Sequence, residues 1–481
     1  MCSSDLTDLS DPRVFKPLEQ ITMPGWLVAP SEPATVRDAL RRCVPELIDG
    51  TLTIEACKPM LRLKGKKWWA TYEATVRDRA GGARVVTLSG ILSPPAGDSS
   101  SPHASQGTFG DLTWRGGLPD LGLELSVQPS DDALPVLASL VDPAAARALL
   151  EESLRSSAYP GINIRACTPE VMRYHPGSRC TVRYRLEYAP GTETGPAMVV
   201  AKTYHGDKGK TAFAGMTALW STELASGQVV RLAEPLAYVP ALRLLVQGPI
   251  AEQETLKKLV RSSEFEPTPE KLDRLGSQVD KVAEGLAALH TSGVSFGESL
   301  SWEDELADVR DVLGRLSPAM PEIVDGATPL LEVLQRLHGG CPRDAAVPTH
   351  RSFRPAQVLL HQGDIGFIDF DGLCMAEPAC DVALFRASLR KAATEAPSRT
   401  GIPAEMETAS RLDVLDELCD RFLTRYQQVA SVSPGRLMLW ETLELLTSVL
   451  HCLTKVKPRL LPIRVATLDH HLRMVGRGHR F

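Results

Sequence analysis

The most informative segment of the chain runs from Thr349 to Asp371 and reads Thr-His-Arg-Ser-Phe-Arg-Pro-Ala-Gln-Val-Leu-Leu-His-Gln-Gly-Asp-Ile-Gly-Phe-Ile-Asp-Phe-Asp. Two short apolar runs, at 358–360 and 365–368, flank a polar turn, which predicts a hairpin. The second run ends on Asp369. A carboxylate at the end of a buried strand, beside a loop that carries His, Ser and Gln, is well placed to hold a metal ion over a cleft.

Length and composition bound the class of protein around this stretch. A chain of 481 residues predicts two to four folded units. Hydrophobic residues make up 43% and charged residues 23%, which is typical of soluble globular proteins. The net charge of −6 has the opposite sign from that of a general phosphate-backbone binder, so we expect no nucleic-acid partner. No stretch approaches 18 uninterrupted apolar residues, so we expect no membrane partner.

The cysteines and the amino terminus indicate a compartment. Ten Cys are scattered without a Cys-x-x-Cys pair, so zinc ribbons and dithiol redox motifs are unsupported. The first eight residues are polar and acidic, without the basic start and apolar run of a secretory signal. We expect a reduced, cytoplasmic protein.

The pattern along the chain changes from strands to helices. Residues 51–127 contain short β-branched or alternating runs, which predict a mainly antiparallel sheet, and the Pro- and Ser-rich segment 93–107 predicts a mobile loop. Asp142 followed by Pro predicts a helix start. Beyond Glu270, apolar residues at spacings of three and four predict a long helix that ends at His290. We therefore expect an α+β fold with an extension at 1–30, a β-rich unit at 31–140, a small sheet lobe at 141–250 and a helical lobe at 251–481.

The β-rich unit resembles a second copy of the region that follows it. The segment that begins at Ile54 aligns with the one that begins at Ile164, and Cys and Pro fall in step at 57/167 and 59/169. In this alignment Leu88 takes the position of Lys202. The alternative is chance similarity between two sheets of like composition. If the repeat is real, the first copy lacks the lysine and serves packing or contact with a protein partner.

Residues 349–381 resemble the catalytic and metal loops of the aminoglycoside phosphotransferase and choline kinase branch of the protein-kinase-like fold. That branch reads His-Gly-Asp, four residues, Asn, then Ile-Asp-Phe, and later Asp-Pro with a further Asp. His350 matches the His, Ser352 stands where the catalytic Asp belongs, and Gln357 stands where the metal-binding Asn belongs. Residues 368–371 match the metal loop, and residues 377–381 match the segment that follows it.

Upstream residues agree with this resemblance, which covers roughly residues 160–475. Lys202 resembles the third-strand lysine that contacts nucleotide phosphates, and Gly177 and Ser178 lie in the turn that would cover them. Gln247 lies in a segment that resembles the hinge between the lobes, and Glu223 is the one acid available to pair with Lys202 from the following helix. The resemblance implies a two-lobed fold that binds ATP and Mg²⁺ in its cleft, with Asp369 and Gln357 on the metal.

Ser352 leaves the function open. A neutral serine is a poor general base, and loss of the base costs about 10²- to 10⁴-fold in rate. Asp371 is the one carboxylate near the loop that could replace it. The first hypothesis is a phosphotransferase with weak or atypical catalysis that acts on a hydroxyl of an unknown small molecule. The second is an inactive pseudokinase that senses nucleotide or acts as a protein scaffold, and the third is altered chemistry such as nucleotidyl transfer.

Overall fold

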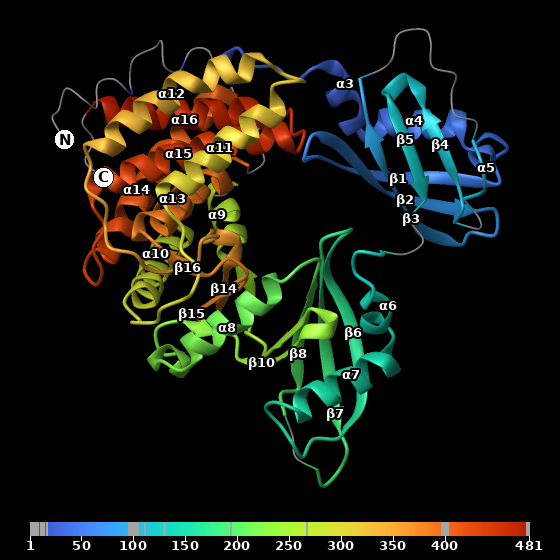
Figure 1. Cartoon of the computed structure of the whole chain (residues 1–481), viewed down its shortest axis with the longest axis horizontal. Coiled ribbons are helices and arrows are strands. Elements are labelled where there is room, and N and C mark those ends of the chain that lie inside the picture. The colour runs from blue at the N-terminus through green and yellow to red at the C-terminus, as the bar shows by residue number, and fades with distance from the viewer. Residues whose placement is uncertain are drawn as a thin grey trace.

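The computed structural model describes residues 9, 15 and 18–477, apart from 95–104, 110–111, 128–130, 193–194, 266–267 and 396–403. Two five-stranded sheets precede a lobe that is mostly helical (Figure 1). The strand-rich half therefore comes first and the helix-rich half second, as the sequence predicts. Most of the predicted loop at 93–107 lies outside the described residues.

The first sheet contains β1 (Leu52–Lys64), β2 (Lys67–Asp78), β3 (Ala83–Leu92), β4 (Arg115–Leu118) and β5 (Leu123–Val127). The helices α3 (Gly25–Val28), α4 (Pro33–Cys43) and α5 (Pro45–Ile48) lie directly before it in the described part of the chain. Successive side chains point to opposite faces of a strand, so Trp68 is buried while its neighbour Trp69 is 37% exposed. The buried face packs against α4, which contributes Val36 and Leu40 to the core.

The second sheet contains β6 (Ile164–His175), β7 (Arg179–Tyr188), β8 (Met198–Tyr204), β10 (Pro235–Val239) and β11 (Leu244–Gln247). Two helices lead into it, α6 (Leu137–Val141) and α7 (Pro143–Arg155), and α8 (Lys208–Trp220) follows β8. Asp142 caps α7 as predicted, because its carboxylate accepts a 2.7 Å hydrogen bond from the backbone N–H of Ala145.

The two sheets share one strand order. The first is β1-β2-β3-β5-β4, and the second, read from its first strand, is β6-β7-β8-β11-β10. Both have a register shift near the start of the first strand, between Ile54 and Ala56 and between Ile164 and Ala166. Both join their last two strands through a 3-10 turn, at Pro119–Leu121 and Pro240–Leu242. The two sheets therefore share their topology in addition to the sequence similarity of their first strands.

The strand register corrects one position of the predicted repeat. In the first sheet Leu123 lies opposite Leu92, and in the second Leu244 lies opposite Thr203. Lys202 therefore corresponds to Ile91, and the expected match to Leu88 is wrong. The alignment failed because β3 has 10 residues and β8 has 7, so counting from the strand start misplaces its end. The first sheet still has an apolar residue at the position of the lysine.

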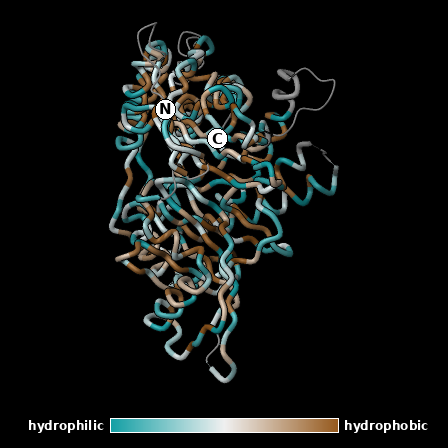
Figure 2. Tube along the Cα trace, turned by 90° about the vertical axis from the view of Figure 1, so that its right-hand side faces the viewer, coloured by the Kyte–Doolittle hydropathy of each residue, from teal (hydrophilic) through white to brown (hydrophobic). Residues whose placement is uncertain are grey.

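The helical lobe contains α9 (Leu256–Phe265), α10 (Pro269–His290), α11 (Trp302–Leu316), α12 (Glu322–Gly339), α13 (Pro378–Thr394), α14 (Ala404–Tyr426), α15 (Pro434–Thr454) and α16 (Leu461–Gly476). Helix α10 ends at His290 as predicted. Helix α15 runs through the centre of the lobe, since most of its side chains are buried and it contacts α13, α16, α11 and α12. The hydrophobic segments of these helices alternate with hydrophilic ones, as expected for helices that share one core (Figure 2).

Short strands connect the helical lobe to the cleft. A four-stranded sheet has the order β12 (Glu254–Thr255), β14 (Val358–His361), β15 (Asp364–Phe367) and β9 (Arg231–Leu232). Strands β13 (Val347–Thr349) and β16 (Cys374–Ala376) pair beside it. Within the described ranges no helix is long and apolar enough to cross a membrane, and the described cysteines are all free.

Candidate active site

The loop predicted to carry the chemistry is held in a strained conformation. It leaves β13 at Thr349, passes through the hairpin of β14 and β15, and returns at β16. Arg351 and Asp369 have positive φ angles of 60° and 74°, which are uncommon for residues other than glycine. Such conformations persist where the surrounding structure fixes them, and they gather at functional sites.

His350 braces this loop. Its backbone N–H donates to Asp381 (2.6 Å), whose carboxylate also contacts the ring of His290 (3.2 Å). The Nε2 atom of His350 lies 3.0 Å from the Ile368 carbonyl, which only accepts hydrogen bonds, so Nε2 carries the proton. In the neutral ring Nδ1 is then an acceptor. Ser352 Oγ lies 3.2 Å from Nδ1 and donates its proton to it.

Two carboxylates and two cations meet where the second sheet faces the helical lobe. Lys202 Nζ lies 3.1 Å from Asp369 and 3.6 Å from Asp371, and Arg179 lies 3.5 Å and 3.1 Å from the same carboxylates. Tyr204 donates a 2.7 Å hydrogen bond to Asp371. Burial raises the pKa of Asp369, but the positive charges of Lys202 and Arg179 outweigh it and hold the pKa well below its usual range. Asp369 is therefore ionised at neutral pH.

Gln357 connects this cluster to Ser352. Its Nε2 donates to the Asp369 carboxylate (3.2 Å) and to Ser352 Oγ (3.3 Å), while its Oε1 is buried without a hydrogen-bond partner. An orphaned amide oxygen beside an ionised carboxylate matches the hard oxygen ligands that Mg²⁺ takes. A cation at Asp369 would favour the amide orientation that turns Oε1 toward it. The residues therefore fit a magnesium ion held by Asp369 and Gln357.

The magnesium site would depend on the nucleotide. In the described residues no group of three or more His, Cys, Asp or Glu could hold a metal ion. Mg²⁺ is commonly bound through one or two carboxylates together with substrate phosphates, and it keeps several waters. The few protein ligands at Asp369 fit that pattern.

The other predicted residues divide between those beside the cluster and one outside it. Gly177 and Ser178 form the turn between β6 and β7, directly before Arg179, and Gln247 is buried at the end of β11. Glu223 is exposed in the 3-10 turn Glu223–Ser226 after α8, and no ion pair joins it to Lys202. The predicted role of Glu223 as the partner of Lys202 is therefore wrong, because α8 contains no acid and the metal-loop carboxylates take that place.

Sequence reasoning missed Arg179 and Tyr204. Both contact Asp371 from more than 160 residues away along the chain, and no local motif marks such a contact. The available signal was position. Arg179 follows the turn predicted to cover phosphates, and Tyr204 lies two residues after Lys202 in the same strand, on the same face.

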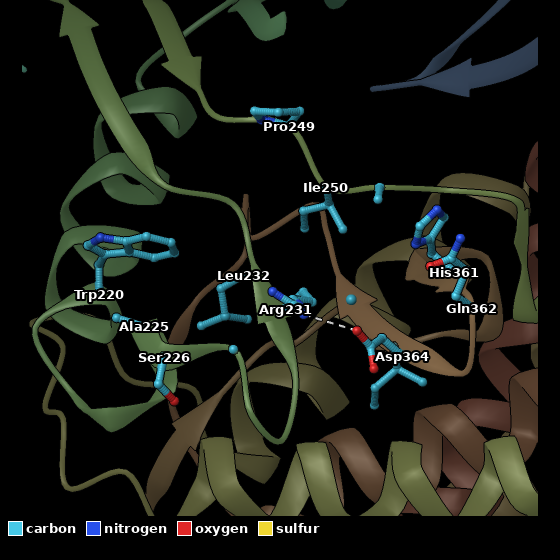
Figure 3. Close-up of a pocket in the computed structure, with 14 residues that line it drawn as sticks. Trp220, Ala225, Ser226, Arg231, Leu232, Pro249, Ile250, His361, Gln362 and Asp364 are labelled. Carbon is cyan, nitrogen blue, oxygen red and sulfur yellow. Dashed lines mark hydrogen bonds and ion pairs between the residues drawn. The ribbon is translucent and has the colours of Figure 1, made fainter. Parts of the chain in front are cut away.

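Two hollows lie near this region and differ in content. One, of about 440 Å³, is lined by Ser352, Arg351 and Arg354 of the loop together with residues of α11, α13 and α15. The other, of about 450 Å³, lies between β9 and the hairpin of β14 and β15, where Arg231 pairs with Asp364 at 3.0 Å (Figure 3). The second contains none of the predicted site residues. A molecule that approaches Ser352 would enter through the hollow lined by Ser352, Arg351 and Arg354.

Residues 200–409 match the model of the phosphotransferase enzyme family, named APH. This segment belongs to that family. It contains Lys202, the 349–371 loop and both metal-loop carboxylates, whereas Gly177, Ser178 and Arg179 precede it. The resemblance predicted from the loop is thus confirmed, and so is the α+β kinase-like fold, with an additional antiparallel sheet before it.

Solved structures similar to this chain include an aminoglycoside phosphotransferase and a choline kinase. An aminoglycoside phosphotransferase APH(4)-Ia variant in complex with AMP-PNP and hygromycin B is 14% identical, over 67% of this chain and 97% of its own, with a TM-score of 0.45. The choline kinase LicA from Streptococcus pneumoniae is 14% identical, over 68% and 99%, with a TM-score of 0.42. No curated protein sequence matches the chain.

Proposed function

We propose that this protein transfers the γ-phosphoryl group of ATP to a hydroxyl group of a small molecule. The observation that carries the proposal is the contact of Lys202 with Asp369, which brings a phosphate-binding cation and a metal-binding carboxylate together from the two lobes. The membership of residues 200–409 in a phosphotransferase family supports it. Asp369 and Gln357 would hold Mg²⁺, which would neutralise charge on the phosphates.

The chain's own residues prepare the transfer. Lys202 and Arg179 carry positive charge to the place where the phosphates would lie, and Gly177 and Ser178 form the turn beside it. The hydroxyl oxygen of the acceptor attacks phosphorus, the bond from phosphorus to the bridging oxygen of ADP breaks, and the hydroxyl proton must leave. Ser352 accepts that proton while it gives its own to Nδ1 of His350.

This relay explains a role for serine at the position of the catalytic Asp. Ser352 is partly exposed in the hollow described above, and it keeps one lone pair for the acceptor because Gln357 occupies the other. Asp371 is less suited to act as a base, since Tyr204, Arg179 and Lys202 already surround its carboxylate. We therefore propose slow phosphoryl transfer, with Ser352 as the group next to the acceptor.

Calorimetry with the non-hydrolysable analogue AMP-PNP tests the proposal. We expect Mg²⁺-dependent binding to the full chain that is lost in Lys202→Ala and in Asp369→Ala. Lys210→Ala, which removes an exposed lysine of α8, is the matched control and should bind normally. Binding without turnover on any acceptor would favour a nucleotide sensor, and absence of binding would exclude both functions.

A further inference from the structure

A group of cations surrounds the Ser352 side of the cleft, and it comes from all three parts of the molecule. Arg62 lies in β1 of the first sheet, Arg173 in β6 of the second, Arg354 follows Ser352, and Lys455 follows α15. No carboxylate among the described residues forms an ion pair with any of the four. Figure 1 shows the three parts facing one another around this region.

Contacts bring the first sheet to this place. Arg62 donates a 3.1 Å hydrogen bond to the Pro176 carbonyl, in the turn between β6 and β7. A Cβ on Gly177 would lie 3.9 Å from Lys64 Nζ, so the first hairpin reaches the turn predicted to cover the phosphates. The first sheet therefore supplies positive charge to the cleft and does more than pack against it.

The pKa shifts of these groups agree with a placement of the four cations near one another. The pKa of Lys455 is lowered by burial and by the charges of Arg354 and Arg62. The pKa of Arg354 is lowered by burial and by Arg173, although Asp369 and Glu444 oppose the shift. His175 has a lowered pKa because of burial and of Arg173, Arg62 and Lys455. Like charges repel one another here, and the lowered pKa of each of these groups reflects that repulsion.

Most of the carboxylates nearby already have partners. Asp369 and Asp371 pair with Lys202 and Arg179. Asp131 accepts hydrogen bonds from the Tyr174 hydroxyl and the Gly177 N–H. Glu444 interacts with Lys391 across the hollow. Asp308, which lines the hollow beside Ser352, has no ion-pair partner among the described residues, so four unpaired cations face one unpaired carboxylate and the balance of charge is positive.

We propose that the acceptor of this phosphotransferase carries a phosphate group, and that Arg62, Arg173, Arg354 and Lys455 bind it. Arginine pairs with phosphate through two parallel hydrogen bonds, and lysine adds a point charge. Arg354 and Lys455 keep exposed surface and Arg62 is half-buried, so a ligand can reach them, although the surrounding protein excludes enough water to lower the pKa of Arg354 and of Lys455. Arg354 Nε donates a hydrogen bond to the Ser352 carbonyl (3.3 Å). The proposed phosphate site therefore lies beside Ser352, where the hydroxyl group of the acceptor would react. The proposal rests on the proposed function and names its substrate class.

The test measures inorganic phosphate binding to the full chain by calorimetry, with and without saturating AMP-PNP and Mg²⁺. We expect binding in both conditions. In Arg62→Gln and Lys455→Gln the affinity should fall tenfold or more, because each loses a charge-assisted hydrogen bond. The matched controls are Lys58→Gln in the same strand, whose lysine pairs with Glu73, and Lys210→Gln in α8, whose lysine is exposed; both should bind phosphate as the unmodified chain does.

A second measurement separates loss of the site from loss of the fold. Removal of one cation relieves repulsion, so the melting temperature of Lys455→Gln should not fall, and that of Arg62→Gln should fall only by what the hydrogen bond to Pro176 contributes. Steady-state kinetics with glycerol and glycerol 3-phosphate then compares an acceptor with its phosphorylated counterpart. We expect turnover of the phosphorylated compound alone, with a KM that the two variants raise while kcat changes little.

The outcomes distinguish this inference from the proposed function. Phosphate that AMP-PNP displaces would assign the cations to the phosphates of ATP and overturn the inference. Equal phosphate affinity in all four variants would also overturn it. A third outcome is that AMP-PNP does not bind, that phosphate does bind, and that Arg62→Gln and Lys455→Gln lose phosphate binding. In that case the proposed function is wrong but the anion site is correct.

Discussion

Replacement of Ser352 by Asp should increase the rate of phosphoryl transfer. The side chain of Ser352 occupies the position of the catalytic Asp, and a carboxylate there would accept the hydroxyl proton directly instead of through His350. Recovery of a general base gives about 10²- to 10⁴-fold in rate, which corresponds to about 3 to 5 kcal/mol of barrier. We therefore expect Ser352→Asp to raise kcat by at least a hundredfold.

The structure also gives the cost of this substitution. Ser352 Oγ and Asp369 Oδ2 lie 3.3 Å and 3.2 Å from the same Gln357 nitrogen. Two carboxylates roughly 6 Å apart repel each other by about 3 kcal/mol at an effective dielectric constant of about 20. This repulsion raises the pKa of the new carboxyl and lowers stability, and Mg²⁺ at Asp369 would offset part of it. Ser352→Asp should therefore gain more thermal stability from Mg²⁺ and AMP-PNP than the unmodified chain does.

The assay is single-turnover transfer of the labelled γ-phosphoryl group to an accepted substrate. Ser352→Asn is the matched control, since it has the shape of Asp without the charge, and it should show no gain. Turnover of the unmodified chain at about 1–100 s⁻¹, a typical kinase rate, with Ser352→Asp no faster, would contradict this prediction. In that case the missing carboxylate would not limit the reaction.

Three further predictions concern the charged groups. Lys202→Ala should lower the free energy of unfolding by about 3–5 kcal/mol in urea titrations, because it leaves Asp369 and Asp371 with too little positive charge, and Lys202→Ala with Asp369→Asn should lose less. Tyr204→Phe should cost about 1.5–3 kcal/mol in the same assay, since it removes the hydrogen bond to Asp371. Burial raises the pKa of Glu441, but two arginines outweigh it and bring it from 4.5 to about 2, so this group stabilises the fold above pH 4.5 and its contribution is lost as the pH falls toward 2. Melting temperatures measured across that pH range should fall, and they should fall less steeply in Glu441→Gln.

The part of the site that lies close together in sequence could be predicted. The 349–371 loop is a continuous segment in which hairpin, turn and carboxylate follow one another, so its spacing carried the family, the fold class and the positions of Ser352, Gln357 and Asp369. The end of α10 could also be predicted, because a helix of 22 residues with one apolar face has a strong period.

Contacts between distant segments could not be predicted. The Arg179 and Tyr204 contacts to Asp371 span 192 and 167 residues, and nothing in either local sequence marks them. The predicted ion pair of Glu223 with Lys202 was wrong for the opposite reason. Family resemblance supplied an expected ion pair, but this chain gives the role to Asp369 and Asp371. The predicted match of Leu88 to Lys202 was wrong because β3 and β8 differ in length and their starts do not correspond.

The shared order of the two sheets has a consequence for how the chain folds. Each strand of one sheet has a counterpart in the other with the same neighbours and the same direction, so a newly made chain offers two places for the same hairpin. Wrong pairing between copies is a known failure of repeat proteins. Divergence protects against it here: β3 and β8 differ in length, and an isoleucine stands where the other copy has a lysine. The difference in strand length and the exchange of lysine for isoleucine thus give each strand a mark of the sheet to which it belongs.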